Sequence, residues 1–276
     1  MRRMKIICCF LCVAVLMACT LPVQAAGIRV AIDGDVCDIE WTLPTDGVIC
    51  VPIRACVTAI TQQDCTIDWD DATQTARITA NNLIMNIPYD SHYIIANGRY
   101  IYSTQKTYAI DGTMFVPIRS LSKAFGAEAD WDGANQIAHI TRGEQTILNG
   151  VYFYNEEDLY WLSRIIASES GTESLQGKIA VGNVVLNRVK DEQFANTVKD
   201  VVFECTNGNY QFSPVKYGTV YREPDYESIV AAKICLEGYT ISDEILYFVE
   251  ASYSQNSWFS RNCTYEQTIG NHAFFS

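Results

Sequence analysis

Residues 162–189 read LSRIIASESGTESLQGKIAVGNVVLNRV and indicate helices in the second half of the chain. Apolar residues at positions 159, 162, 165 and 166 recur at helical spacing, after acidic residues 156–158 that suit a first turn. A second apolar pattern predicts another helix from about Glu173 to Lys190. We therefore expect residues 148–276 to form a separately folded, mostly α-helical domain.

One carboxylate falls on the apolar side of the first predicted helix. Glu169 lies four residues after Ile165 and near the helix end, whereas Glu156 and Glu157 fit a solvated role. Burial disfavours the charged form of a carboxyl group, so such a residue can stay protonated near neutral pH. It could then donate a proton to a leaving oxygen, which makes Glu169 the candidate catalytic acid.

The first half of the chain repeats itself. VPIR at 51–54 recurs at 116–119, DWD at 68–70 recurs at 130–132, and ARIT at 76–79 is echoed by AHIT at 138–141. Each copy predicts a strand ending at the proline, then a helix, a strand with a buried tryptophan and a final strand. For Arg54, Trp69, Arg119 and Trp131 we favour packing and strand-end hydrogen bonding over ligand binding.

This duplicated pattern resembles the copper amine oxidase N-terminal-like domain, over about residues 28–142. The resemblance implies no copper site, and the isolated His92 and His139 agree with that. By analogy it implies a wall-associating or spacing element. The expected fold class is therefore α+β with two domains, a β-rich duplicated module at residues 27–147 followed by the helical domain.

The length of the chain and its net charge limit the number of domains and the kinds of partner that we expect. The chain has 276 residues, of which 32 are acidic and 20 basic, for a formal net charge of −12. This length suits two domains, each with its own core. The acidic balance argues against nucleic acid as a partner, since phosphates are bound by clusters of Lys and Arg.

Residues 1–26 have the pattern of a secretory signal peptide. Basic residues at positions 2, 3 and 5 precede an apolar run at 6–17, which is too short to span a membrane, and PVQA at 22–25 offers a cleavage site. Cleavage would leave 17 basic against 32 acidic residues, a charge of −15, with no transmembrane segment. Lipid anchoring through Cys19 is the less favoured alternative, because Met17 fits a lipoprotein signal poorly.

The sequence has eleven cysteines, and removal of the predicted signal peptide would leave seven of them. Alignment of the two copies places Cys50, Cys56 and Cys65 opposite apolar residues, so we expect core positions for them. Export permits disulfides, and the sequence leaves open whether any form.

The second half lacks the common hydrolase motifs. It has one histidine, His272, and neither a His-Glu-x-x-His nor a Gly-x-Ser-x-Gly motif, so a zinc or serine hydrolase is not expected. The quoted stretch resembles the signature of the SleB/CwlJ spore-cortex and cell-wall hydrolases, over about residues 157–275. Further blocks follow in the family's order: QFSPV at 211–215, LYF at 246–248 and IGNHAF at 269–274.

The resemblance implies a lysozyme-like fold that acts on peptidoglycan glycan strands, in a secreted protein of the cell wall or spore envelope. The family's catalytic glutamate matches Glu169, and its second glutamate matches Glu173. The implied reaction is lytic transglycosylation at the MurNAc–GlcNAc bond, with one glutamate and no metal or cofactor. The candidates for binding substrate are Glu173, Tyr210, Gln211, Phe212, Tyr247, Trp258 and His272. For Glu173, a structural role at the start of the second predicted helix is also open.

Two alternatives remain open from the sequence. The protein could be a non-catalytic cell-wall-binding or structural surface protein, or a peptidoglycan amidase that cuts the stem peptide. For Asn187 and Arg188, which lie at the end of the second predicted helix, a structural role is favoured.

Overall fold

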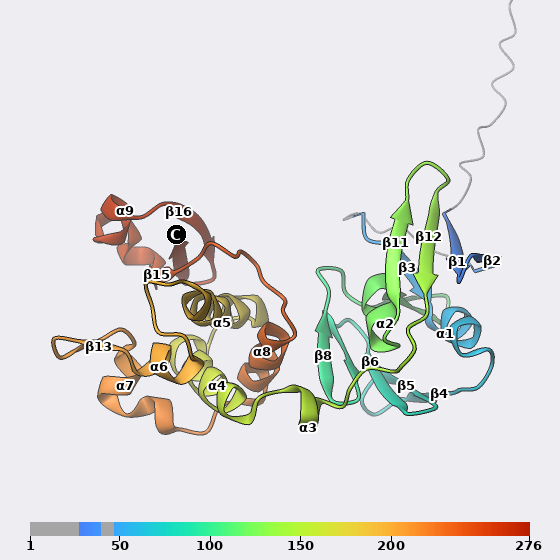
Figure 1. The fold of residues 1–276 in the computed structure, drawn as a ribbon, viewed down its shortest axis with the longest axis horizontal. Helices are drawn as coiled ribbons and strands as arrows, with labels where there is room; N and C mark the ends of the chain where they lie inside the picture. The colour runs from blue at the N-terminus through green and yellow to red at the C-terminus, as the bar shows by residue number, and fades with distance from the viewer. Residues whose placement is uncertain (1–27, 40–46) are drawn as a thin grey trace, which may run out of the picture.

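The computed structural model describes residues 28–39 and 47–276. Strands dominate the part of the chain up to residue 141 and helices dominate from residue 150 onward, as Figure 1 shows for the two halves. The α+β class and the order of its two parts are therefore confirmed. The predicted signal peptide and Cys19 lie outside the described residues. Within the described part, no helix is long and apolar enough to cross a membrane.

The described residues of the N-terminal half form three sheets. They have the strand orders β11-β12-β1-β2, β3-β10-β9 and β4-β5-β6-β7-β8, and β1 pairs with β12 in parallel. The strands are β1 (Arg29–Ile32), β2 (Asp35–Cys37), β3 (Cys50–Pro52), β4 (Thr66–Asp70), β5 (Thr75–Ala80), β6 (Leu83–Pro88), β7 (Tyr93–Ala96), β8 (Arg99–Tyr102), β9 (Tyr108–Ile110), β10 (Thr113–Pro117), β11 (Glu128–Asp132) and β12 (Ile137–Thr141).

The two VPIR blocks meet at the centre of this half. Strands β3 and β10 are antiparallel, with Val51 opposite Val116. Helices α1 (Ile53–Thr61) and α2 (Ile118–Ala124) begin directly after the prolines that end these strands. Proline suits this place because its missing N–H is not needed in the first helical turn.

Residues in the left-handed conformation close two hairpins and one helix end of this half. Asn97 (φ 48°) and Gly98 (φ 79°) turn β7 into β8, and Asp111 (φ 49°) and Gly112 (φ 77°) turn β9 into β10. Gly126 (φ 68°) follows α2, as a glycine cap should.

The prediction of buried tryptophans in the repeats is wrong. Trp69 is 46% exposed and Trp131 is 40% exposed. Their strands, β4 and β11, show the same alternation of exposed and half-buried positions, and each lies at the edge of its sheet. An edge strand has a neighbour on one side only, so its large side chains can remain open to solvent.

Buried aliphatic residues from both repeats form one continuous core in this half. Cys50 and Cys56 are fully buried, which confirms the core positions predicted for them. Cys65 is half-buried and packs against the core from its edge. The seven cysteines of the described chain are all free thiols.

Helices α4, α5 and α8 pack against one another at the centre of the C-terminal half. Its helices are α3 (Gly150–Phe153), α4 (Glu156–Ser170), α5 (Leu175–Lys190), α6 (Val198–Phe203), α7 (Ser213–Tyr217), α8 (Tyr226–Leu236) and α9 (Phe259–Asn262), with 3-10 turns η1 (Thr219–Tyr221) and η2 (Ala251–Asn256). A small sheet of order β15-β17-β16 completes it, beside the short hairpin β13-β14. These strands are β13 (Cys205–Thr206), β14 (Asn209–Tyr210), β15 (Tyr247–Glu250), β16 (Tyr265–Ile269) and β17 (His272–Phe275).

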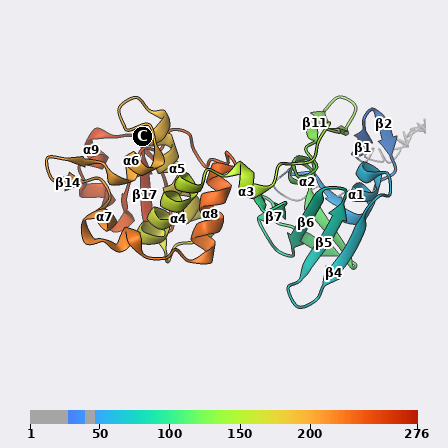
Figure 2. The ribbon, with the colours of Figure 1, turned by 60° about the horizontal axis from the view of Figure 1, so that its bottom comes forward.

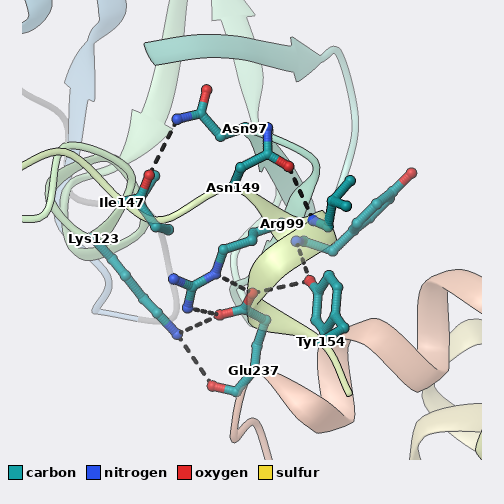
Figure 3. Close-up of polar contacts among 9 residues, drawn as sticks. Asn97, Arg99, Lys123, Ile147, Asn149, Tyr154 and Glu237 are labelled. Carbon is teal, nitrogen blue, oxygen red and sulfur yellow. Dashed lines mark hydrogen bonds and ion pairs between the residues drawn. The ribbon is translucent and has the colours of Figure 1, made fainter. Parts of the chain in front are cut away.

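The two halves meet where β8 faces α8, with α3 running between them, as seen from two directions in Figures 1 and 2. Glu237, just after α8, has a side chain only 2% exposed and receives two 2.7 Å hydrogen bonds from the Arg99 guanidinium. The Tyr154 hydroxyl donates to the same carboxylate at 2.9 Å, and the Lys123 ammonium lies 3.3 Å from it. Figure 3 shows these side chains converging onto Glu237 from β8, from α2 and from the residue that follows α3. A buried polar cluster therefore joins the halves.

Candidate active site

Glu169 lies in the last turn of α4 and is half-buried. Burial raises the pKa of Glu169 to about 7, and the positive charge of Arg188 opposes that rise. The end of a helix also presents unpaired carbonyl groups with partial negative charge, which disfavour a carboxylate there. The environment therefore keeps the acid form of this carboxyl group stable to a higher pH than is usual for glutamate.

The ends of α4 place this residue. The Asn155 side chain accepts a hydrogen bond from the Asp158 N–H and begins the helix, with acidic residues in its first turn. At the other end, a Cβ on Gly171 would lie 2.6 Å from the Ala167 carbonyl oxygen, so the chain needs glycine to leave the helix. The position of Glu169 is thus fixed by the Asn155 cap at the start of α4 and by the close backbone approach at Gly171 after its end.

Arg188, on α5, is the cation that faces Glu169. It is 5% exposed, its Nε donates to the Leu246 carbonyl oxygen at 2.8 Å, and its guanidinium lies 5.0–5.5 Å from the ring centres of Phe194, Phe212 and Tyr247. Its Nη1 is buried and has no hydrogen-bond partner in the described chain. The structural role predicted for Arg188 is confirmed by the bond to Leu246, but its charge also acts on the candidate acid.

Glu204 is a second carboxylate near Arg188, and the sequence reading missed it. Its charge acts on the Arg188 guanidinium, and its Oε2 is buried without a hydrogen-bond partner among the described residues. It follows α6 directly, in a loop whose sequence shows no periodic pattern. Neighbouring Asn187 is structural as predicted, because its amide donates to the carbonyl oxygens of Ser242 and Ile245 at 3.0 Å.

Glu173 occupies the turn between α4 and α5 and is 8% exposed. Its carboxylate accepts hydrogen bonds from the Asn271 amide at 2.8 Å and from the Asn271 backbone N–H at 3.2 Å. A Cβ on Gly270 would lie 1.8 Å from Glu173 Oε2, so the hairpin between β16 and β17 approaches closely here. Glu173 is predicted to bind substrate, yet the contacts it makes hold the strand that carries His272.

His272 is half-buried at the start of β17, opposite Glu250 of β15. Burial lowers the pKa of His272 below its usual range, against the opposing charges of Glu173 and Glu250. Its Nδ1 is buried and has no hydrogen-bond partner within the described residues. The ring packs edge-on against Phe248, at 5.2 Å between centroids.

The other predicted substrate-binding residues fall into two groups. Tyr210 and Trp258 are 42% and 57% exposed, Gln211 is exposed and Tyr247 is half-buried, so these four remain open to a ligand. Phe212 is only 2% exposed and packs against Phe248 and the Arg188 guanidinium. Phe212 therefore supports Arg188 from within the core and offers little of its ring to a ligand.

Two family models match the chain, each over its own part. Residues 172–275 match the Cell Wall Hydrolase family, and residues 32–147 match the copper amine oxidase N-terminal domain. Both resemblances drawn from the sequence are therefore confirmed. The hydrolase match begins three residues after Glu169 and includes Glu173 and every other predicted substrate-binding residue.

Curated relatives and a solved structure are similar to part of the chain. A spore cortex-lytic enzyme from Oceanobacillus iheyensis is 27% identical over 121 residues, which are 44% of this chain and 42% of that protein. The Bacillus cereus spore cortex-lytic enzyme is 28% identical, over 44% and 45% of the two chains. The chain thus matches less than half the length of these relatives. The catalytic domain of the germination-specific lytic transglycosylase SleB from Bacillus anthracis is 27% identical, covering 47% of this chain and all of that one, with a TM-score of 0.40.

Proposed function

We propose that this chain is an exported peptidoglycan lytic transglycosylase that cleaves the MurNAc–GlcNAc bond, with Glu169 as its single catalytic carboxyl group. The name of the matching family and the names of the relatives support the substrate class. The observation that carries the proposal for Glu169 is its place in the last turn of α4, where burial raises its pKa to about 7 against the charge of Arg188.

A pKa near the working pH suits a group that must act twice. A general acid must begin protonated, and a general base must be able to take a proton afterwards. Burial favours the acid form of Glu169, while Arg188 stabilises the carboxylate that remains once the proton has left. This balance supports one residue in both roles.

The proposed reaction has two steps. Glu169 first protonates the oxygen that links MurNAc to GlcNAc, and the bond between that oxygen and the anomeric carbon breaks. The substrate's own acetamido group stabilises the positive charge on the sugar. The Glu169 carboxylate then takes the proton from the C6 hydroxyl, whose oxygen attacks the anomeric carbon and closes a 1,6-anhydro ring. Glu169 ends protonated, ready for another cycle.

The remaining architecture belongs to the same proposal. Residues 1–26 would be removed on export, residues 27–147 would form a duplicated module, and residues 148–276 would form a lysozyme-like catalytic domain. The pairing of Val51 with Val116 supports the duplication, because corresponding residues of the two repeats lie opposite each other. Two hydrophobic cores support the division into domains, and Tyr100 of β8 packs into the second core.

Digestion of purified peptidoglycan tests the proposal. The wild type and Glu169→Gln are incubated with intact sacculi, and the soluble fragments are analysed by mass spectrometry. We expect anhydro-muramic ends from the wild type and none from the variant. New reducing ends would instead show hydrolysis by water, and released stem peptides would show an amidase. Intact sacculi after incubation with the wild type would contradict the enzymatic role.

A further inference from the structure

A groove of about 240 Å³ opens beside Trp69 in the N-terminal half. Arg54 of α1, Asp68 and Trp69 of β4, and Gly112 and Met114 at the hairpin between β9 and β10 line it. The Trp69 indole N–H donates to Asp71 Oδ1 at 2.7 Å, which orients the ring while it stays 46% exposed. An ordered aromatic face therefore borders an open space.

A second groove, of about 410 Å³, repeats this construction beside Trp131. It is lined by Arg119, Trp131, Gly47 and Ile49, together with other residues. Corresponding residues of the two repeats are 65 positions apart for three pairs: Arg54 and Arg119, Gly47 and Gly112, and Ile49 and Met114. Trp69 and Trp131 are 62 positions apart. The two grooves therefore use the same positions of the two repeats.

Each groove combines parts of both repeats. Arg54 and Trp69 of the first repeat meet the Gly112 hairpin of the second, while Arg119 and Trp131 of the second meet Gly47 of the first. This exchange follows from the antiparallel pairing of β3 with β10, which places the start of each strand beside the end of the other. The grooves are thus a consequence of how the repeats join.

The groove arginines are available to a ligand. Neither Arg54 nor Arg119 takes part in an ion pair among residues 28–39 and 47–276, although Asp68 lines the same groove as Arg54. Among the described residues, the Arg119 side chain donates one hydrogen bond, to the Ala129 carbonyl oxygen at 3.1 Å. A planar guanidinium binds carboxylates and hydroxyls well, and an indole face packs against the C–H face of a sugar ring.

We propose that both grooves bind glycan strands of peptidoglycan, with the indole against a sugar ring and the guanidinium on a muramyl or stem-peptide carboxylate. This inference rests on the proposed function for the choice of glycan, since the module is joined to the half assigned to peptidoglycan. Two sites on one module raise binding to a repeating polymer well above that of either site alone. The module would then hold the catalytic half on its insoluble substrate.

Co-sedimentation of the full chain with purified sacculi tests the proposal. Trp69→Ala, Trp131→Ala and the double variant are compared with Tyr89→Ala, which removes a 48% exposed aromatic residue of the same half that lines neither groove. We expect each single variant to bind roughly tenfold more weakly, and the double variant roughly a hundredfold or more. Tyr89→Ala should bind as the wild type does. Thermal melts check that all variants are folded.

A soluble substrate separates this inference from the proposed function. Cleavage of a short muropeptide tetrasaccharide needs no wall anchoring, so the double variant should keep wild-type turnover on it. Unchanged sedimentation of the double variant would overturn the grooves as glycan sites, whether or not the tetrasaccharide is cut. If the double variant no longer sediments and the wild type does not cut the tetrasaccharide, the grooves would stand as glycan sites. The proposed enzymatic function would then be overturned. Binding of stem peptides alone, without glycan, would overturn the assignment of a sugar to the indole.

Discussion

The cluster around Glu237 predicts how strongly the two halves are held together. Glu237→Gln keeps the shape of the side chain and removes its charge. Arg99, whose side chain is 11% exposed, is then left buried without its carboxylate partner. Breaking a buried pair in this way costs about 3–5 kcal/mol of folding free energy. Lys123 is 44% exposed, so Lys123→Ala should cost only about 0–1 kcal/mol.

Urea denaturation followed by tryptophan fluorescence measures both variants, because described tryptophans lie in each half. A double variant, Arg99→Met with Glu237→Gln, removes both charges and should be less destabilised than the sum of the single changes.

Burial alone would raise the pKa of Glu237, but hydrogen bonds from Arg99 and the charge of Lys123 lower it below its usual range. The cluster's stabilisation should therefore be complete above the pKa of the unfolded chain and be lost as pH falls through the lower folded value. A Glu237→Gln cost no larger than that of Lys123→Ala would refute this reasoning.

Glu169, Gly270 and the cysteines each allow a further test. Because Glu169 must start protonated and its pKa is about 7, turnover on soluble muropeptides should fall as pH rises through about 7, measured as a pH–rate profile. Gly270→Ala should destabilise the fold by more than Gly208→Ala in thermal melts, since both have positive φ but only the former places a Cβ against Glu173. Native protein should expose the Cys205 thiol to a thiol reagent at once, while the unfolded mature chain should titrate seven thiols; fewer than seven would reveal disulfides.

Local patterns in the sequence predicted the helices well. The predicted start at Glu156 is the first residue of α4, and the predicted helix from about Glu173 to Lys190 became α5, beginning at Leu175 after a Ser174 cap. These elements are determined by apolar spacing and end residues close in sequence. Placement of Glu169 on the partly buried side of α4 follows from the same spacing.

Contacts between distant residues could not be predicted in this way. Glu173 is tied to Asn271, 98 positions away, and Arg99 pairs with Glu237, 138 positions away. The exposure of Trp69 depends on β4 being an edge strand, which is a property of the whole sheet. The role of Arg188 beside Glu169 likewise depends on how α4 and α5 pack.

We propose that Glu169 donates the proton that allows the glycosidic bond to break. Turnover of Glu169→Gln on a soluble muropeptide, compared with Glu156→Gln on the exposed first turn of the same helix, tests it most directly. Removing a general acid costs about 10²–10⁴-fold in rate, so we expect a loss of that size for Glu169→Gln and none for Glu156→Gln. A Glu169→Gln enzyme that turns over as fast as the wild type would contradict the account.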